Sequence, residues 1–166
     1  LAHTLNRFQG GGKLYVVSFQ DIQVAIRDHC TDSNRVVLYR RMMYRIAHAL
    51  AELKNCQGLV TGESVGQVAS QTLKNLMAVS CVVPMSILRP LIGMNKQEII
   101  THAKQIGTYD ISIEPQPDCC SVFMPDHPGT SCKIKYLEAD ERLYPWEELM
   151  SSALDSMETI DLDDLD

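Results

Sequence analysis

Short apolar runs of strand type alternate along this chain with longer stretches whose apolar residues recur at helical spacing. Such alternation is typical of parallel βαβ units, in which helices connect neighbouring strands of one sheet. Ligands of these sheets bind at the carboxyl ends of the strands. We therefore expect an α/β fold. The predicted strands are residues 13–19, 58–61 and a proline-interrupted region within 80–93, and the predicted helices are residues 21–28, 34–53, 65–79 and 96–106.

Residues 58–72, GLVTGESVGQVASQT, have the pattern of a strand that turns into a helix. The turn contains Gly62, where a backbone can approach a ligand with no side chain in the way. Ser64 followed by Gln67 has the spacing of a capping box, which predicts a helix from residue 65. Two interpretations follow: a ligand-binding turn, or a well-capped core helix after a tight turn.

The predicted helix 34–53 carries arginines in two settings. A helical wheel places Arg40 at the edge of the apolar face. An arginine there either extends along its own stem to water or contacts an anionic or aromatic ligand. Arg41 and Arg45 fall on the polar face together with Glu52, so we expect Arg41 to be solvated.

A further signal is the sequence IGMNKQEII at residues 92–100. Asn95 as N-cap, with Glu98 three residues later, predicts a capping box. Lys96 then takes the first helical position, where the helix dipole is positive and a cation is mildly disfavoured. Lys96 is either an exposed side chain that tolerates this cost, or part of an anion site in which its charge and the dipole act together.

Residues 107–132 form a loop-like stretch with four prolines and three of the six cysteines. Cys119 and Cys120 are adjacent there, and a thiol at the ligand edge of a sheet can be a nucleophile or a sulfur carrier. The alternatives are an inert cysteine pair, or zinc held by Cys119, Cys120, His127 and Cys132. Adjacent cysteines are a poor chelating geometry and no CxxC pair occurs, so we expect no metal site. Six cysteines without a secretory signal favour a reducing compartment, the cytoplasm.

The net charge of −6 is unevenly distributed. Residues 140–166 hold ten acidic residues and one basic residue, which leaves eleven acidic and fourteen basic residues, about +3, in residues 1–139. A mildly basic body is compatible with nucleic acid. The acidic end is interpreted as a solvated, helical tail. No apolar run approaches the roughly 20 residues needed to span a bilayer, so no membrane partner is expected.

Four stretches of the chain together carry a specific pattern: LYRRMMYRIAHALAE, LVTGESVGQVASQTLKNL, LRPLIGMNKQEIITHAKQIGTYDISI and PDCCSVF. With them the chain resembles, from about Lys13 to Lys135, the tRNA 4-thiouridine synthetase family, also named for thiamine biosynthesis (ThiI). The resemblance implies a Rossmann-like parallel sheet of the adenine-nucleotide α-hydrolase type, a PP-loop ATPase fold. Members of the family adenylate a tRNA uridine with ATP and Mg²⁺ and then replace its C4 oxygen with persulfide sulfur. The family also supplies sulfur for thiazole formation in thiamine synthesis.

The resemblance also implies roles for individual residues. Arg40, Gly62 and Gln71 match family positions that help to hold ATP. Lys96 matches the catalytic lysine, and Cys119, the first cysteine of the DCC run, matches the reactive thiol. The implied partners are tRNA and a cysteine desulfurase that donates the persulfide, and a homodimer is compatible with the family.

The chain also departs from the family pattern. The phosphate loop SGGxDS does not occur in these residues, and QGGGK at 9–13 lacks Ser and Asp at the needed spacing. The THUMP domain and the rhodanese domain of some members are not recognised either. We therefore expect residues 1–139 to be the C-terminal portion of a PP-loop ATP-pyrophosphatase domain, incomplete and inactive alone, followed by the acidic segment 140–166. Two alternatives stay open: an NAD synthetase-like PP-loop ligase, and an inactive half-domain remnant.

Overall fold

The computed structural model describes residues 1–115 and 123–164. Within these ranges, no helix combines the length and the apolar character that a bilayer crossing requires. The helices are α1 (Ala2–Asn6), α2 (Gln20–His29), α3 (Arg35–Leu53), α4 (Leu73–Ser80), α5 (Lys96–Gln105), α6 (Tyr109–Ser112), α7 (Ile134–Glu141) and α8 (Trp146–Asp155), with the 3₁₀ turns η1 (Asp32–Asn34) and η2 (Ala69–Gln71). The strands are β1 (Lys13–Val16), β2 (Gly58–Val60), β3 (Ser86–Leu88) and β4 (Glu158–Asp161).

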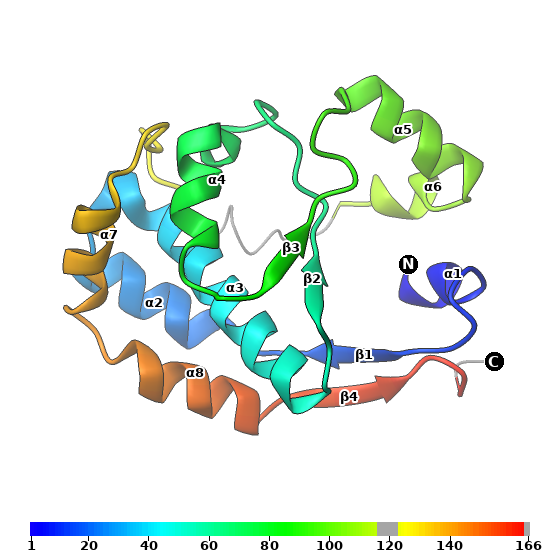
Figure 1. The fold of residues 1–166 in the computed structure, drawn as a ribbon, viewed down its shortest axis with the longest axis horizontal. Coiled ribbons are helices and arrows are strands. Elements are labelled where there is room, and N and C mark those ends of the chain that lie inside the picture. The colour runs from blue at the N-terminus through cyan, green and yellow to red at the C-terminus, as the bar shows by residue number, and fades with distance from the viewer. Residues whose placement is uncertain (116–122, 165–166) are drawn as a thin grey trace.

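The longest helix, α3, forms the centre of the core. Its Leu38, Tyr39 and Met42 side chains are fully buried. Figure 1 shows α2 and α8 packed against one side of α3, with α4 and β2 against another. The apolar residues of α3 recur every three or four positions, which lets one helix contact several neighbours.

The strands β2 and β3 form the parallel unit that the alternation predicts. They pair in register, with Leu59 opposite Ile87 and Val60 opposite Leu88. α4 connects them, as the crossover between parallel strands requires. The α/β prediction is confirmed, and the carboxyl ends of both strands lie at the same edge of the sheet.

Residues 140–164 of the acidic segment are folded, so the interpretation of this segment as a solvated tail is wrong. β1 pairs with β4 in a separate antiparallel ribbon, not with the parallel strands. In α8, Trp146, Leu149 and Ala153 pack on the hydrophobic core. A charge count over the whole segment hides these apolar residues, which recur at helical spacing on one face of α8.

Arg41 is buried, although the helical wheel predicts a solvated side chain. It is 2% exposed, and its Nε and Nη2 donate to the two carboxylate oxygens of Glu141 at 2.7 and 2.8 Å. Arg45 donates to the same carboxylate at 2.7 Å. The prediction is wrong because the partner comes from α7, 100 positions away in the sequence, and a wheel of α3 contains no information about it.

The helix predicted from residue 65 begins only at Leu73. The N-cap of α4 is Thr72, whose hydroxyl accepts the backbone N–H three residues later at 3.2 Å. Residues 65–71 instead form a loop and the turn η2, with Gly66 at φ +77°, outside the helical region. The capping-box pattern at Ser64 is wrong because its polar groups bond to other parts of the chain.

The start of α5 confirms the second capping box. The Asn95 side chain accepts the N–H groups of Gln97 and Glu98, and the Glu98 carboxylate accepts the Asn95 N–H at 2.7 Å. No residue of α5 is buried, and this helix packs chiefly against α6. In Figure 1 the two helices stand apart from the helices around α3. We refer to α5 and α6 as the α5–α6 lobe.

Candidate functional site

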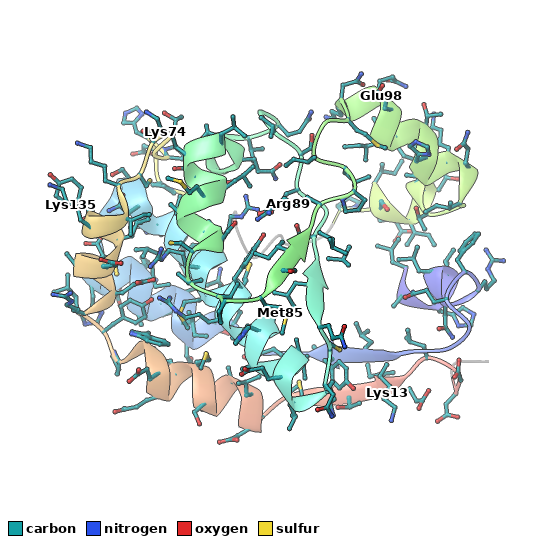
Figure 2. All side chains as sticks on the ribbon, in the orientation of Figure 1. Lys13, Lys74, Met85, Arg89, Glu98 and Lys135 are labelled. Carbon is teal, nitrogen blue, oxygen red and sulfur yellow. The ribbon has the colours of Figure 1, made fainter. Side chains whose placement is uncertain are left out.

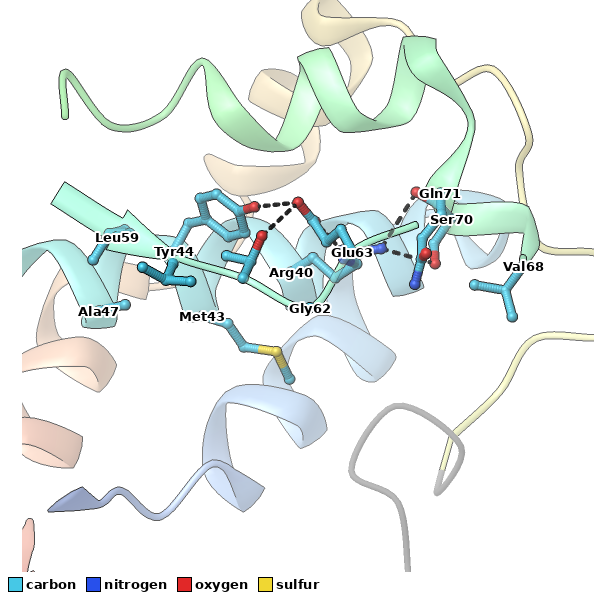
Figure 3. Close-up of a pocket in the computed structure, with 12 residues that line it drawn as sticks. Arg40, Met43, Tyr44, Ala47, Leu59, Gly62, Glu63, Val68, Ser70 and Gln71 are labelled. Atoms are coloured by element: carbon cyan, nitrogen blue, oxygen red, sulfur yellow. Dashed lines mark hydrogen bonds and ion pairs between the residues drawn. The ribbon is translucent and has the colours of Figure 1, made fainter. Parts of the chain in front are cut away.

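A cavity of about 560 Å³ lies at the carboxyl end of β2, between α3 and the loop that follows the strand (Figure 3). Its position agrees with the general rule for ligand sites in parallel sheets. Arg40, Gly62 and Gln71 all line it, so the fold brings together the three residues that the resemblance assigns to ATP. The full lining is Arg40, Met43, Tyr44, Ala47, Leu59, Val60, Thr61, Gly62, Glu63, Val68, Ser70 and Gln71.

The Glu63 carboxylate is the centre of the polar contacts at this cavity. It is 4% exposed and accepts hydrogen bonds from the Tyr44 hydroxyl at 2.6 Å and from Arg89 Nε at 2.5 Å. Arg40 Nη2 forms an ion pair with its other oxygen. Figure 2 shows Arg89 extending from the end of β3 toward α4, where its Nη2 donates to the Ser80 hydroxyl at 2.5 Å. Glu63 therefore joins α3, β2 and β3.

The Glu63 carboxyl is ionised at neutral pH. Burial alone would raise its pKa, but the hydrogen bonds from Tyr44 and Arg89 and the charge of Arg40 outweigh burial, so the pKa lies below its ordinary value. Burial and the bond to Glu63 raise the pKa of the Tyr44 hydroxyl, which stays protonated. The carboxylate of Glu63 thus compensates the guanidinium of Arg40 at the cavity wall.

Arg40 does not extend to water. Its side chain is 12% exposed, and besides its ion pair it donates from Nη1 to the Ser70 hydroxyl at 3.2 Å. This placement in the cavity lining excludes an arginine that extends to water, and contact with a ligand stays a prediction.

Gly62 and Gln71 lie in the loop between β2 and α4 that lines the cavity. A Cβ built on Gly62 would meet no protein atom within 4 Å, so a ligand can reach the backbone there. The Gln71 side-chain oxygen accepts the Ser64 N–H at 2.9 Å, and its carbonyl accepts the Gly66 N–H at 3.0 Å. Gln71 therefore holds the loop in its shape as well as lining the cavity.

Lys96 is not brought into the cavity. It is exposed at the first position of α5, and the lining does not include it. The expected anion site at this helix start stays a prediction. Its relation to the cavity depends on how the α5–α6 lobe is attached.

The predicted reactive thiol, Cys119, lies with Cys120 outside the described residues. Of the alternative zinc set, His127 and Cys132 are described. His127 is exposed. The Cys132 N–H donates to the Asn75 side chain at 2.9 Å, and burial raises the pKa of its thiol. In the ranges that the structure covers, no three His, Cys, Asp or Glu side chains are grouped to hold a metal ion. The zinc alternative needs both undescribed cysteines and stays untested.

Sequence reasoning missed Glu63, Tyr44 and Arg89. A usable signal existed for two of them, because Glu63 and Arg89 are charged residues directly beyond the carboxyl ends of β2 and β3. Tyr44 gives no such signal, since its position in α3 is indistinguishable from that of any other tyrosine in an apolar helix face.

The comparisons with known proteins agree with one another on the family. The family model described as thiamine biosynthesis protein (ThiI) matches residues 1–144. A probable tRNA sulfurtransferase of Moorella thermoacetica is 43% identical over 160 residues, covering 96% of this chain and 41% of that protein. A probable tRNA sulfurtransferase of Thermus thermophilus is 44% identical over 160 residues, with 96% and 39% covered.

A solved structure is also similar in fold. The crystal structure of a 4-thiouridine synthetase–RNA complex with bound ATP superposes with a TM-score of 0.88 at 36% identity. The match covers 96% of this chain and 42% of that chain. The present chain thus spans about two fifths of the length of the relatives that it matches.

Proposed function

The chain belongs to the thiamine biosynthesis protein (ThiI) family, and on this premise we propose that it is the C-terminal portion of the PP-loop domain of a tRNA sulfurtransferase that makes 4-thiouridine. The enzyme of the relatives' length, of which it would form part, is called the full-length enzyme below. The observation that carries the proposal is the cavity where Arg40, Gly62 and Gln71 meet at the carboxyl end of β2.

The cavity fits the nucleoside part of ATP. Its volume of about 560 Å³ is in the range of small-molecule sites. Met43, Ala47 and Val68 supply apolar surface for a base. Arg40 and Arg89 share the Glu63 carboxylate, so the cavity wall offers a planar guanidinium whose positive charge is only partly compensated. A triphosphate would then extend out of the cavity, past the open backbone at Gly62.

The remaining parts of the reaction follow from the family assignment. ATP would supply the adenylyl group that makes the uridine C4 oxygen a leaving group, with Mg²⁺ accompanying the phosphates. Lys96 would stabilise the negative charge that develops there, and Cys119 would carry the incoming sulfur. We propose tRNA as substrate, a separate cysteine desulfurase as sulfur donor, sulfur supply for thiamine synthesis as a second role, a homodimer as assembly, and the cytoplasm as location.

An exchange assay separates this proposal from its alternatives. The full-length enzyme should exchange pyrophosphate into ATP only with tRNA present, because the adenylated group is a tRNA uridine. An NAD synthetase-like ligase would exchange without tRNA once its own nucleotide substrate is supplied as the adenylyl acceptor. An inactive remnant would give no exchange at all.

The nucleotide assignment is tested with Arg40→Ala in the full-length enzyme. We expect the KM for ATP to rise by about tenfold, which corresponds to about 1.4 kcal/mol, since a fixed contact in the cavity wall is lost. Arg142→Ala, at an exposed position of the same residue type, is the control and should leave KM unchanged. Arg41→Ala is unsuitable as a control, because Arg41 is buried against Glu141. An unchanged KM in Arg40→Ala would sink the assignment.

The sulfur-transfer assignment is tested with Cys119→Ser. This change should abolish 4-thiouridine formation and leave tRNA-dependent pyrophosphate exchange nearly intact, because other residues hold ATP. Cys120→Ser should retain substantial thiolation, and the exposed Cys56 should be dispensable. Full thiolation by Cys119→Ser, or stoichiometric zinc in the purified enzyme, would contradict the assignment.

A further inference from the structure

The segment that leads into the α5–α6 lobe, residues 92–94, accepts hydrogen bonds from two consecutive residues of the loop after β2. The Ser64 hydroxyl donates to the Met94 carbonyl at 2.7 Å, and the Val65 N–H donates to the Ile92 carbonyl at 3.1 Å. Because α5 buries none of its residues, packing contributes little to its placement. We refer to these two hydrogen bonds as the joint.

Ser64 forms one hydrogen bond toward the cavity and one toward the α5–α6 lobe. It is 2% exposed, and its N–H donates to the side chain of Gln71, which lines the cavity. Its hydroxyl bonds the carbonyl directly before Asn95, the N-cap of α5. Lys96 is the next residue after that cap. A single buried side chain therefore lies between the cavity and the start of the helix that carries Lys96.

We propose that Ser64 is a positioning residue that fixes Lys96 relative to the nucleotide cavity. This inference rests on the proposed function and adds a residue to its site. Ser64 would touch no reacting atom. Its effect would come from holding the Met94 carbonyl, because a reacting group must be placed within about 1 Å for efficient transfer.

The test compares Ser64→Ala with Ser112→Ala in the full-length enzyme. Ser112 lies in α6, and its hydroxyl donates to the Thr108 carbonyl at 2.7 Å, so the control removes a bond of equal length inside the lobe. Ser64→Ala keeps the backbone N–H that bonds Gln71. It should therefore lower kcat by about 10- to 100-fold with the KM for ATP changed less than about twofold. Ser112→Ala should keep both constants.

Hydrogen–deuterium exchange tests the joint without reference to activity. In Ser64→Ala, amides of residues 92–113 should exchange faster, while α3 and α4 stay protected. Unchanged exchange, an unchanged kcat, or a rise in KM alone would overturn the proposal. So would loss of protection throughout the protein in both Ser64→Ala and the similarly sized Ser64→Cys, since Ser64 would then be a general core residue. If the unmodified enzyme forms no 4-thiouridine, the proposed function fails while the exchange result still decides the joint.

Discussion

At the scale of single residues, Glu63 has the most concentrated set of contacts. One buried carboxylate accepts from Arg40, Tyr44 and Arg89, and Thr61 adds a fourth bond at 3.1 Å. A carboxylate with this many donors offsets its cost of desolvation, whereas its removal would leave two partly buried guanidinium groups without their counter-charge.

Glu63→Ala should lower the free energy of unfolding by about 3 kcal/mol, because Arg40 and Arg89 would stay partly buried without their carboxylate. Glu63→Gln keeps an acceptor and should cost less. Glu52→Ala is the control: its side chain is 66% exposed and lies 3.7 Å from His48, so the change should stay within about 0.5 kcal/mol. Urea unfolding measures all three. Equal unfolding midpoints for the two alanine variants would argue against a central role for Glu63.

Local signals at this scale were predictable from the sequence, and tertiary partners were not. The capping box at Asn95 is confirmed because it needs only residues within one turn of helix. Arg40 was predicted at an apolar edge, but Glu63, its partner 23 positions away, was not. The roles of Lys96 and Cys119 stay predictions.

At the scale of elements, α3 and α7 are connected by an ion network. Arg41 and Arg45 of α3 share the Glu141 carboxylate of α7, and Arg41 also donates to the Ala78 carbonyl of α4 at 2.6 Å. Burial alone would raise the pKa of Glu141, but the two arginines outweigh it and lower that pKa. The ionised Glu141 carboxylate of α7 thus holds Arg41, which in turn contacts α4.

This network predicts a loss of stability in acid. The folded-state pKa of Glu141 lies below its unfolded value, so its contribution is present above about pH 4.5 and is lost as the pH falls through the folded pKa. Glu141→Gln should therefore show a shallower fall in stability between about pH 5 and pH 3. Glu138→Gln, on the exposed side of α7, should keep the slope of the unmodified protein. Urea midpoints across this pH range are the measurement, and identical slopes for both variants would refute the assignment.

Element types were easier to predict than element boundaries. The parallel pair β2 and β3 and the helix α3 follow from periodicity. The start of α4 does not, because Gly66 and the hydrogen bonds of Gln71 hold residues 65–71 out of the helix. Bonds within the loop and the bond from Ser64 to Met94 decide this competition, and helical spacing of apolar residues does not reveal them.

At the scale of the whole molecule, the C-terminal segment packs on the preceding part of the chain. α8 packs on α2 and α3, and β4 completes a ribbon with β1 near the other end of the chain. Figure 1 shows α1 and the end of β4 on the same side of the molecule. The prediction of a tail from net charge is wrong because net charge bears on solubility and association and not on packing.

Removal of residues 146–166 should therefore destabilise the protein by about 5 kcal/mol or more, since several large apolar side chains of α8 leave the core. That loss is comparable to the stability of a whole domain, so the shortened protein should be largely unfolded. Removal of residues 164–166 alone is the control and should have little effect. Circular dichroism during heating distinguishes the outcomes, and a normal cooperative transition in the long deletion would restore the solvated-tail interpretation.

The hydrogen bond between Ser64 and Met94 is a pivot beside Lys96 for any rotation of the α5–α6 lobe. α5 has ten residues and extends about 15 Å from that point. A rotation of about 10° would move its far end, at Gln105, by about 2–3 Å. Lys96, next to this pivot, would move by only a small fraction of that distance. A ligand that displaced the outer end of α5 would therefore displace Lys96 far less.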